Sequence, residues 1–214
     1  MSEFLSLLKY NFSLEFRNRT QVISLLLLAW IVCYILFKIH PSLESTEFGY
    51  LFWMFMTLLS INVCLRSESY NGQEIRLYLY TIVDPVLIYL SKVVFNSCYL
   101  FLIAFLFYLS FHIYFTEQVS FEVNLIFVIL IGAFAISSTL TFVSTVSTYA
   151  NGQNTLVSIL AIPLLLPIIM LLKGLSDEVI LGESIEYLKY WTILGLASIS
   201  IAASLLLVPH IWKE

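Results

Sequence analysis

The stretch from Val123 to Val146, VNLIFVILIGAFAISSTLTFVSTV, decides the fold class of this chain. It carries no Asp, Glu, Lys or Arg, and its apolar residues fall on every side of a helix. A helix needs about 20 predominantly apolar residues to cross the hydrocarbon core of a membrane. A strand of a lipid-facing barrel would instead alternate over about ten residues. We therefore interpret this stretch as a transmembrane helix.

The same criterion finds five further charge-free stretches in the rest of the chain. They are Gln21–Phe37, Phe48–Leu65, Val93–Phe115, Thr155–Leu172 and Trp191–Val208. The sequence therefore predicts an all-α membrane protein with six transmembrane helices in one domain, residues 21–214. Residues 1–20 precede this domain as a separate segment.

The composition supports a membrane protein and excludes a soluble one. Of 214 residues, 60% are apolar and 11% charged, and the mean hydropathy is +0.95. So few charged side chains cannot cover a compact globule, so most of its surface faces lipid. The net charge of -4 argues against a nucleic-acid partner. Cys33, Cys64 and Cys98 lie in apolar runs without C-x-x-C spacing, and we predict that they are small core residues.

The charges are distributed unequally between the two faces that this topology defines. Seven basic residues fall on the face that carries the termini: Lys9, Arg17, Arg19, Arg66, Arg76, Lys92 and Lys213. On the other face, the three basic residues Lys38, Lys173 and Lys189 meet eight acidic ones. Because basic segments are retained on the cytoplasmic side, we expect both termini to be cytoplasmic.

The N-terminal segment has the pattern of an interfacial helix. Its apolar residues recur near helical spacing and its charged residues fall elsewhere on the wheel; the apolar set is Phe4, Leu5, Leu8, Phe12 and Phe16. We expect residues 1–20 to lie along the membrane surface with this apolar face in lipid. The alternative is a simple basic anchor that only sets the topology.

Motifs of catalysis and nucleotide binding are absent from the sequence. There is no G-x-x-x-x-G-K-[ST], no H-E-x-x-H and no G-x-S-x-G, and no residues have metal-ligand spacing. The predicted spans also lack ionisable groups, which argues against an intramembrane enzyme and a proton-coupled transporter. We predict that the chain is not an enzyme.

Several polar or unusual residues within or beside the spans have two interpretations each. His40 and His112, on the non-cytoplasmic side, are candidate haem ligands or ordinary headgroup-level residues. Hydroxyl residues crowd the stretch Ser137–Thr148, where they serve helix packing or a substrate path. Pro163 and Pro167 each remove a backbone hydrogen bond, which predicts a hinge or cavity wall, or else a static kink.

The connection between the second and third spans, residues 66–92, is too long for a tight turn. Asn71 and Gly72 predict a turn, and Asp84 and Pro85 predict the cap and first position of a new helix. A structured cytoplasmic element between two spans is suited to receiving force from a partner. An ordinary re-entry loop is the alternative.

This arrangement resembles the permeases of ABC-type exporters. The shared features are an N-terminal surface helix, six spans, and a motif in the connection between the second and third spans. This motif is an acidic residue, a glycine and an apolar residue in a turn, followed by a proline and then a lysine before the third span; here these are Glu68, Gly72, Ile75, Pro85 and Lys92. Within that group the chain is most similar to the heme exporter protein B family (CcmB). Trp53, the Asn71–Glu74 turn and the double proline of Leu156–Ile169 carry the match, although the family usually has an acidic residue where Asn71 stands.

The resemblance implies a permease subunit of the cytochrome c maturation system in the bacterial inner membrane. Its partners would be a separate ABC ATP-binding subunit, other maturation proteins and a haem chaperone, with haem as possible cargo, ATP bound only by the partner subunit, and a possible homodimer. The residues expected near the ATP-binding subunit are Arg66, Glu68, Asn71, Gly72, Glu74, Arg76, Asp84 and Pro85. The alternatives are a permease that exports a lipid or drug, and a scaffold for haem-handling proteins that transports nothing.

Overall fold

The computed structural model describes residues 2–17, 19–40, 45–69, 82–115, 122–149, 154–182, 184 and 186–211. Within these residues every regular element is an α-helix. The helices are α1 (Ser2–Arg17), α2 (Arg19–Ile39), α3 (Ser45–Ser69), α5 (Pro85–Tyr114), α6 (Val123–Tyr149), α7 (Asn154–Leu181) and α8 (Tyr187–Ile211).

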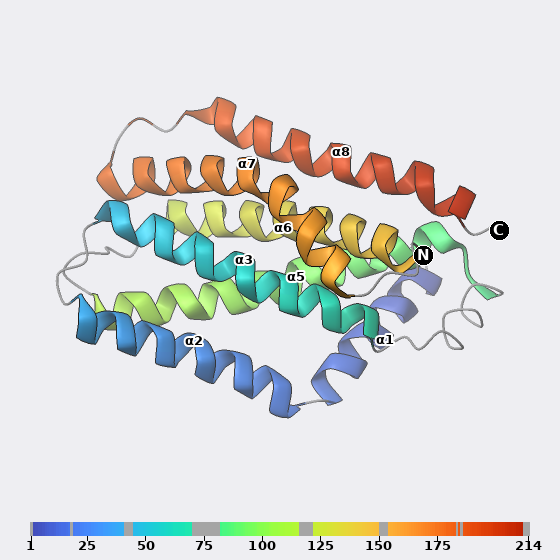
Figure 1. Cartoon of the computed structure of the whole chain (residues 1–214), viewed down its shortest axis with the longest axis horizontal. Helices are drawn as coiled ribbons and strands as arrows, with labels where there is room; N and C mark the ends of the chain where they lie inside the picture. The colour runs from blue at the N-terminus through green and yellow to red at the C-terminus, as the bar shows by residue number, and fades with distance from the viewer. Residues whose placement is uncertain are drawn as a thin grey trace.

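The helices form an elongated antiparallel bundle with both termini at one end (Figure 1). Helix α1 runs obliquely to the others at this end, which we call the proximal end. The opposite, distal end gathers the start of α3, α6 and α8 and the end of α2, α5 and α7. The shared end of the termini is the arrangement that the topology predicted.

In the part of the chain that the structure describes, five helices are long and apolar enough to cross a membrane. The spans are Glu47–Cys64, Pro85–Tyr114, Val123–Ser147, Ile159–Leu181 and Tyr187–Val208. They correspond to the second to sixth predicted spans. The first predicted span lies on α2, whose apolar stretch Ile23–Ile39 is shorter. The chain is therefore a multi-pass membrane protein.

Helix α6 occupies the centre of the bundle and packs against α3, α5, α7 and α8. Its hydroxyl residues bond to other helices and to its own backbone. Ser137 donates to the Val93 carbonyl at 3.1 Å, and Asn96 donates to the Thr141 hydroxyl at 3.2 Å. Because these side chains are buried and make such bonds, the structure favours packing over a substrate path.

Trp53 of α3 joins three helices in the core. Its indole N–H donates to Ser176 of α7 at 2.8 Å, and the side chain is 1% exposed. Gly132 of α6 lies directly under the ring, because a methyl group at that position would come within 2.4 Å of Trp53 Cη2. The ring therefore fills a space that α6 leaves open only by having a glycine.

Helix α1 packs on α5 rather than lying in lipid alone. The Phe12 and Phe95 rings meet edge to face at 4.9 Å, and the Asn11 amide donates to the Ser91 hydroxyl at 3.5 Å. Leu7 is buried, while Leu5 on the same helix is exposed. Part of the apolar side of α1 therefore packs against the bundle, and part of it is exposed.

The cysteines follow the prediction in two of three cases. Cys33 and Cys64 are buried, but Cys98 is exposed on α5. An exposed thiol is compatible with a membrane helix, since apolar surface there faces lipid. The prediction of a core position was wrong for Cys98.

Loss of the Ser176 hydroxyl should destabilise the fold. In Ser176→Ala the buried indole N–H loses its acceptor, at a cost of about 1–3 kcal/mol in free energy of unfolding. Ser198→Ala is the matched control, because Ser198 is exposed and bonds only its own helix. Unfolding of both variants in detergent checks this, and equal stabilities would contradict it.

Candidate functional site

The proximal end contains the start of α5, where the predicted coupling segment finishes. The Val86 N–H donates to Asp84 Oδ1 at 2.9 Å, and Pro85 occupies the first turn. Asp84 is therefore the N-cap of this helix and Pro85 its first residue, as the sequence predicted. Helix α5 continues from here through the predicted span that starts at Val93, and Lys92 is a buried residue within the helix.

The other predicted coupling residues are described in part or lie outside the described residues. Arg66 and Glu68 belong to the last turns of α3, but their side chains lie outside the described part. Asn71, Gly72, Glu74 and Arg76 lie outside the described residues altogether. Their assignment to the contact with an ATP-binding subunit remains a prediction.

The distal end of α7 and the start of α8 carry a network of charged side chains, which we call the distal cluster. It consists of Lys173, Asp177, Glu178, Glu186 and Lys189. Lys173 pairs with Asp177 one helical turn later, and Lys189 pairs with Glu178 across the helix connection. Glu178 also accepts from the Glu186 N–H at 2.9 Å, and Lys189 lies 3.2 Å from the Glu186 carboxylate.

The distal cluster also touches α3. Lys173 Nζ lies 4.1 Å from the centroid of the Tyr50 ring, a favourable cation–π contact. A methyl group on Gly49 would come within 2.9 Å of Asp177 Oδ1, so the Asp177 side chain packs closely against the α3 backbone there. The charged residues therefore fasten α7 to both α3 and α8.

The fifth predicted span ends at Leu172 and the sixth begins at Trp191, which places all five residues in the predicted connection between them. Helix α7 instead continues to Leu181 and ends at Gly182, whose φ of 68° lies in the left-handed region. The spacing of Lys173 and Asp177, four residues apart with no proline between them, is the signal that could have shown this. The fifth predicted span therefore ended too early, and the candidate span Ile159–Leu181 contains ionisable groups beyond it.

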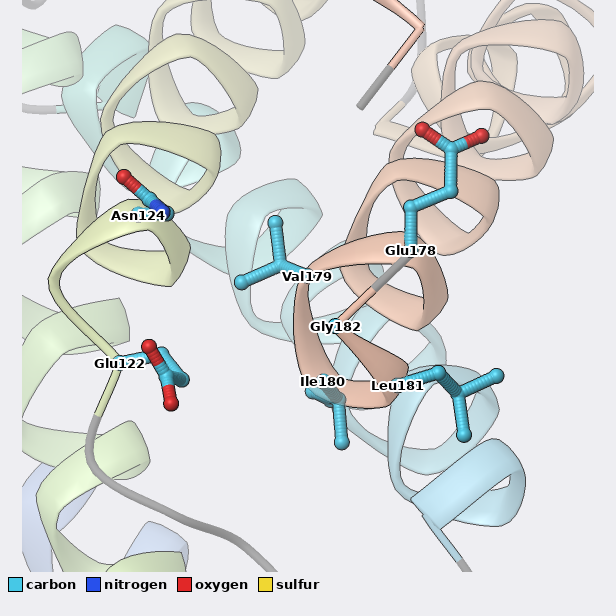
Figure 2. A pocket seen from close by; sticks show the side chains of 7 residues that line it. All are labelled: Glu122, Asn124, Glu178, Val179, Ile180, Leu181 and Gly182. Atoms are coloured by element: carbon cyan, nitrogen blue, oxygen red, sulfur yellow. The ribbon is translucent and has the colours of Figure 1, made fainter. Parts of the chain in front are cut away.

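A pocket of about 340 Å³ opens between the start of α6 and the end of α7 (Figure 2). Glu122 and Asn124 lie on one side of it, and residues 178–182 on the other. The hydroxyl residues of α6 do not line it. The pocket therefore lies at the distal end of the bundle.

The remaining candidates are not members of the distal cluster. His40 is exposed just after α2, and His112 is half-buried near the end of α5. Among the described residues, no three His, Cys, Asp or Glu side chains could together hold a metal ion. Pro163 and Pro167 lie inside α7 on its exposed side, and α7 changes direction along its length (Figure 1).

The chain matches a known protein family. A family model described as CcmB protein matches residues 2–212, which is nearly the whole chain. Searches of curated proteins and of solved structures found no match to this chain.

Proposed function

Because this chain belongs to the CcmB protein family, we propose that it couples ATP hydrolysis in a separate subunit to haem export or to release of a haem-loaded chaperone. Family membership itself implies a heme exporter permease with a role in cytochrome c maturation, not an enzyme. The match over residues 2–212 is the observation that carries the proposal.

The coupling is proposed for the connection that leads into α5. A force applied to this connection would act directly on the first turn of α5, which is ordered by the Asp84 cap and by Pro85 at its first position. Helix α5 then packs on α1, α2 and α6, so its movement would be shared by much of the bundle. The excess of basic residues on this side supports a cytoplasmic proximal end in the bacterial inner membrane.

The partners follow from the same proposal. They are an ABC ATP-binding subunit, other cytochrome c maturation proteins and a haem chaperone, with a second copy of this chain completing the permease. Haem is the proposed cargo. His40 and His112 are the proposed contacts to it at the distal end.

An affinity pull-down from detergent-solubilised membranes tests the proposal. We expect mass spectrometry to recover an ATP-binding subunit together with cytochrome c maturation proteins. An ATP-binding subunit without them would favour a general lipid or drug exporter. Recovery of no ATP-binding subunit would overturn the proposed coupling. In a separate assay, full cytochrome c maturation with a catalytically inactive ATP-binding subunit would favour a scaffold that transports nothing.

Substitutions in the coupling segment should separate assembly from coupling. We expect Glu74→Ala and Arg76→Ala to preserve the amount of chain in the membrane and to lower cytochrome c maturation, while ATP hydrolysis by the complex continues. Wild-type maturation by both variants, alone and together, would contradict the assignment.

The helix cap gives a separate test at the same site. Asp84→Ala should cost about 1 kcal/mol of local helix stability, whereas Asp84→Asn keeps a capping oxygen. We expect maturation to fall in Asp84→Ala and to be retained in Asp84→Asn if the ordered start of α5 is what matters. Equal loss in both would assign the effect to the charge instead.

A further inference from the structure

Helix α7 consists of two parts with different surroundings. From Ile159 to Met170, eight of twelve residues are exposed, and the buried ones form a narrow line on one side. From Leu171 to Leu181, only Leu181 is exposed. The same helix is therefore loosely packed in its proximal part and enclosed in its distal part.

The distal part is held by polar bonds to other helices. Ser176 accepts from Trp53 of α3, and Glu178 pairs with Lys189 of α8. Lys173 lies against the Tyr50 ring of α3, beside the close approach at Gly49. In an apolar environment these polar groups have no water to replace a lost partner, so breaking their bonds is costly. The distal part of α7 therefore keeps a fixed position.

The proximal part has no such fastening, and it contains both prolines. Its residues, ILAIPLLLPIIM, are all apolar and so provide no side-chain hydrogen bonds. Proline cannot donate to the carbonyl four residues earlier, which frees the carbonyls of Ile159 and Pro163 and weakens the helix there. Weak backbone bonding thus coincides with weak packing.

We propose that α7 is a jointed lever, whose proximal part swings at Pro163 and Pro167 while its distal part stays fixed to α3 and α8. This inference rests on the proposed function for its driving force, which is the ATP-binding subunit acting at the proximal end. A rotation of about 20° at Pro167 would displace Ile159 by about 4 Å, given a rise of 1.5 Å per residue.

Distances between spin labels test the lever. In a chain whose three cysteines are replaced by alanine, one label pair joins Ile159 to Leu206 of α8, and the control pair joins Leu181 to Phe127 of α6; all four positions are exposed. In the complex, we expect trapping with an ATP analogue to shift the first distance by about 4 Å and to leave the control distance unchanged. Equal shifts in both pairs, or none, would overturn the lever.

The isolated chain in lipid nanodiscs separates the lever from the proposed function. We expect a broader distance distribution for the Ile159–Leu206 pair than for the control pair, and a narrower one once Pro163→Ala and Pro167→Ala are combined. The unchanged control pair would show that the double variant is folded. Equal widths would overturn the joint, whereas failure to recover an ATP-binding subunit would overturn the proposed coupling.

Discussion

Gly132→Ala should destabilise the bundle by about 1–3 kcal/mol, although alanine is the better helix former. The new methyl group would lie 2.4 Å from Trp53 Cη2 and 3.0 Å from a methyl group of Leu172. The indole cannot withdraw easily, because it is 1% exposed and its N–H is bonded to Ser176. Thermal unfolding in detergent, together with the amount of folded chain in membranes, measures the effect.

Gly195→Ala provides the matched control for this prediction. A methyl group there meets nothing within 4 Å, so we expect a neutral or slightly stabilising change. Trp53→Phe removes the ring atoms that a methyl group at Gly132 would contact. The double variant Gly132→Ala with Trp53→Phe should therefore lose less stability than the sum of the losses in the two single variants. Gly132→Ala as stable as Gly195→Ala would refute the tight fit between α6 and Trp53.

Glu178→Ala should weaken the attachment of α8 to α7 by about 1–3 kcal/mol. The change leaves Lys189 with the Glu186 carboxylate at 3.2 Å, and it deprives the Glu186 N–H of its acceptor. The cost stays below that of a fully buried pair, because 27% of the Lys189 side chain is exposed. Proteolysis of the α7–α8 connection and thermal unfolding both report this loss.

Two further variants test whether the pair between Glu178 and Lys189 is the main attachment of α8 to α7. Glu186→Ala should change stability by less than about 0.5 kcal/mol, since that side chain is 64% exposed. Exchange of the two charges, Glu178→Lys with Lys189→Glu, should restore part of the stability lost in Glu178→Ala. If Glu186→Ala were the more damaging change, the pair between Glu178 and Lys189 would not be the main attachment.

The helical class and the approximate positions of five spans could be predicted because apolar length alone determines them. The end of α7 could not, because the charge-free stretch stops at Lys173 although the helix continues to Leu181. In the structure Lys173 pairs with Asp177 and Glu178 with Lys189, so helices continue where isolated charges would have stopped them. The free-energy cost of a charged side chain in such a helix depends on its ion-pair partners, and the fold determines which partners are near it.

The contacts that define the core were equally hidden in the sequence. Trp53 could be noticed as a large residue and Gly132 as a small one, but their contact depends on how α3 and α6 cross. The hydroxyl residues of α6 predicted close packing without naming partners. Local features such as the Asp84 cap were predictable, because both partners lie within three residues of each other.

The central position of α6 has a consequence for how the chain is made. Translation delivers α3 and α5 to the membrane before α6 and α7, so Asn96 lacks the Thr141 hydroxyl of α6, and Trp53 lacks the Ser176 hydroxyl of α7, until those helices are inserted. An unpaired amide in hydrocarbon is costly, which makes the half-made protein a target for membrane proteases. We therefore expect variants of these residues to reveal themselves first as rapid degradation of newly synthesised chain.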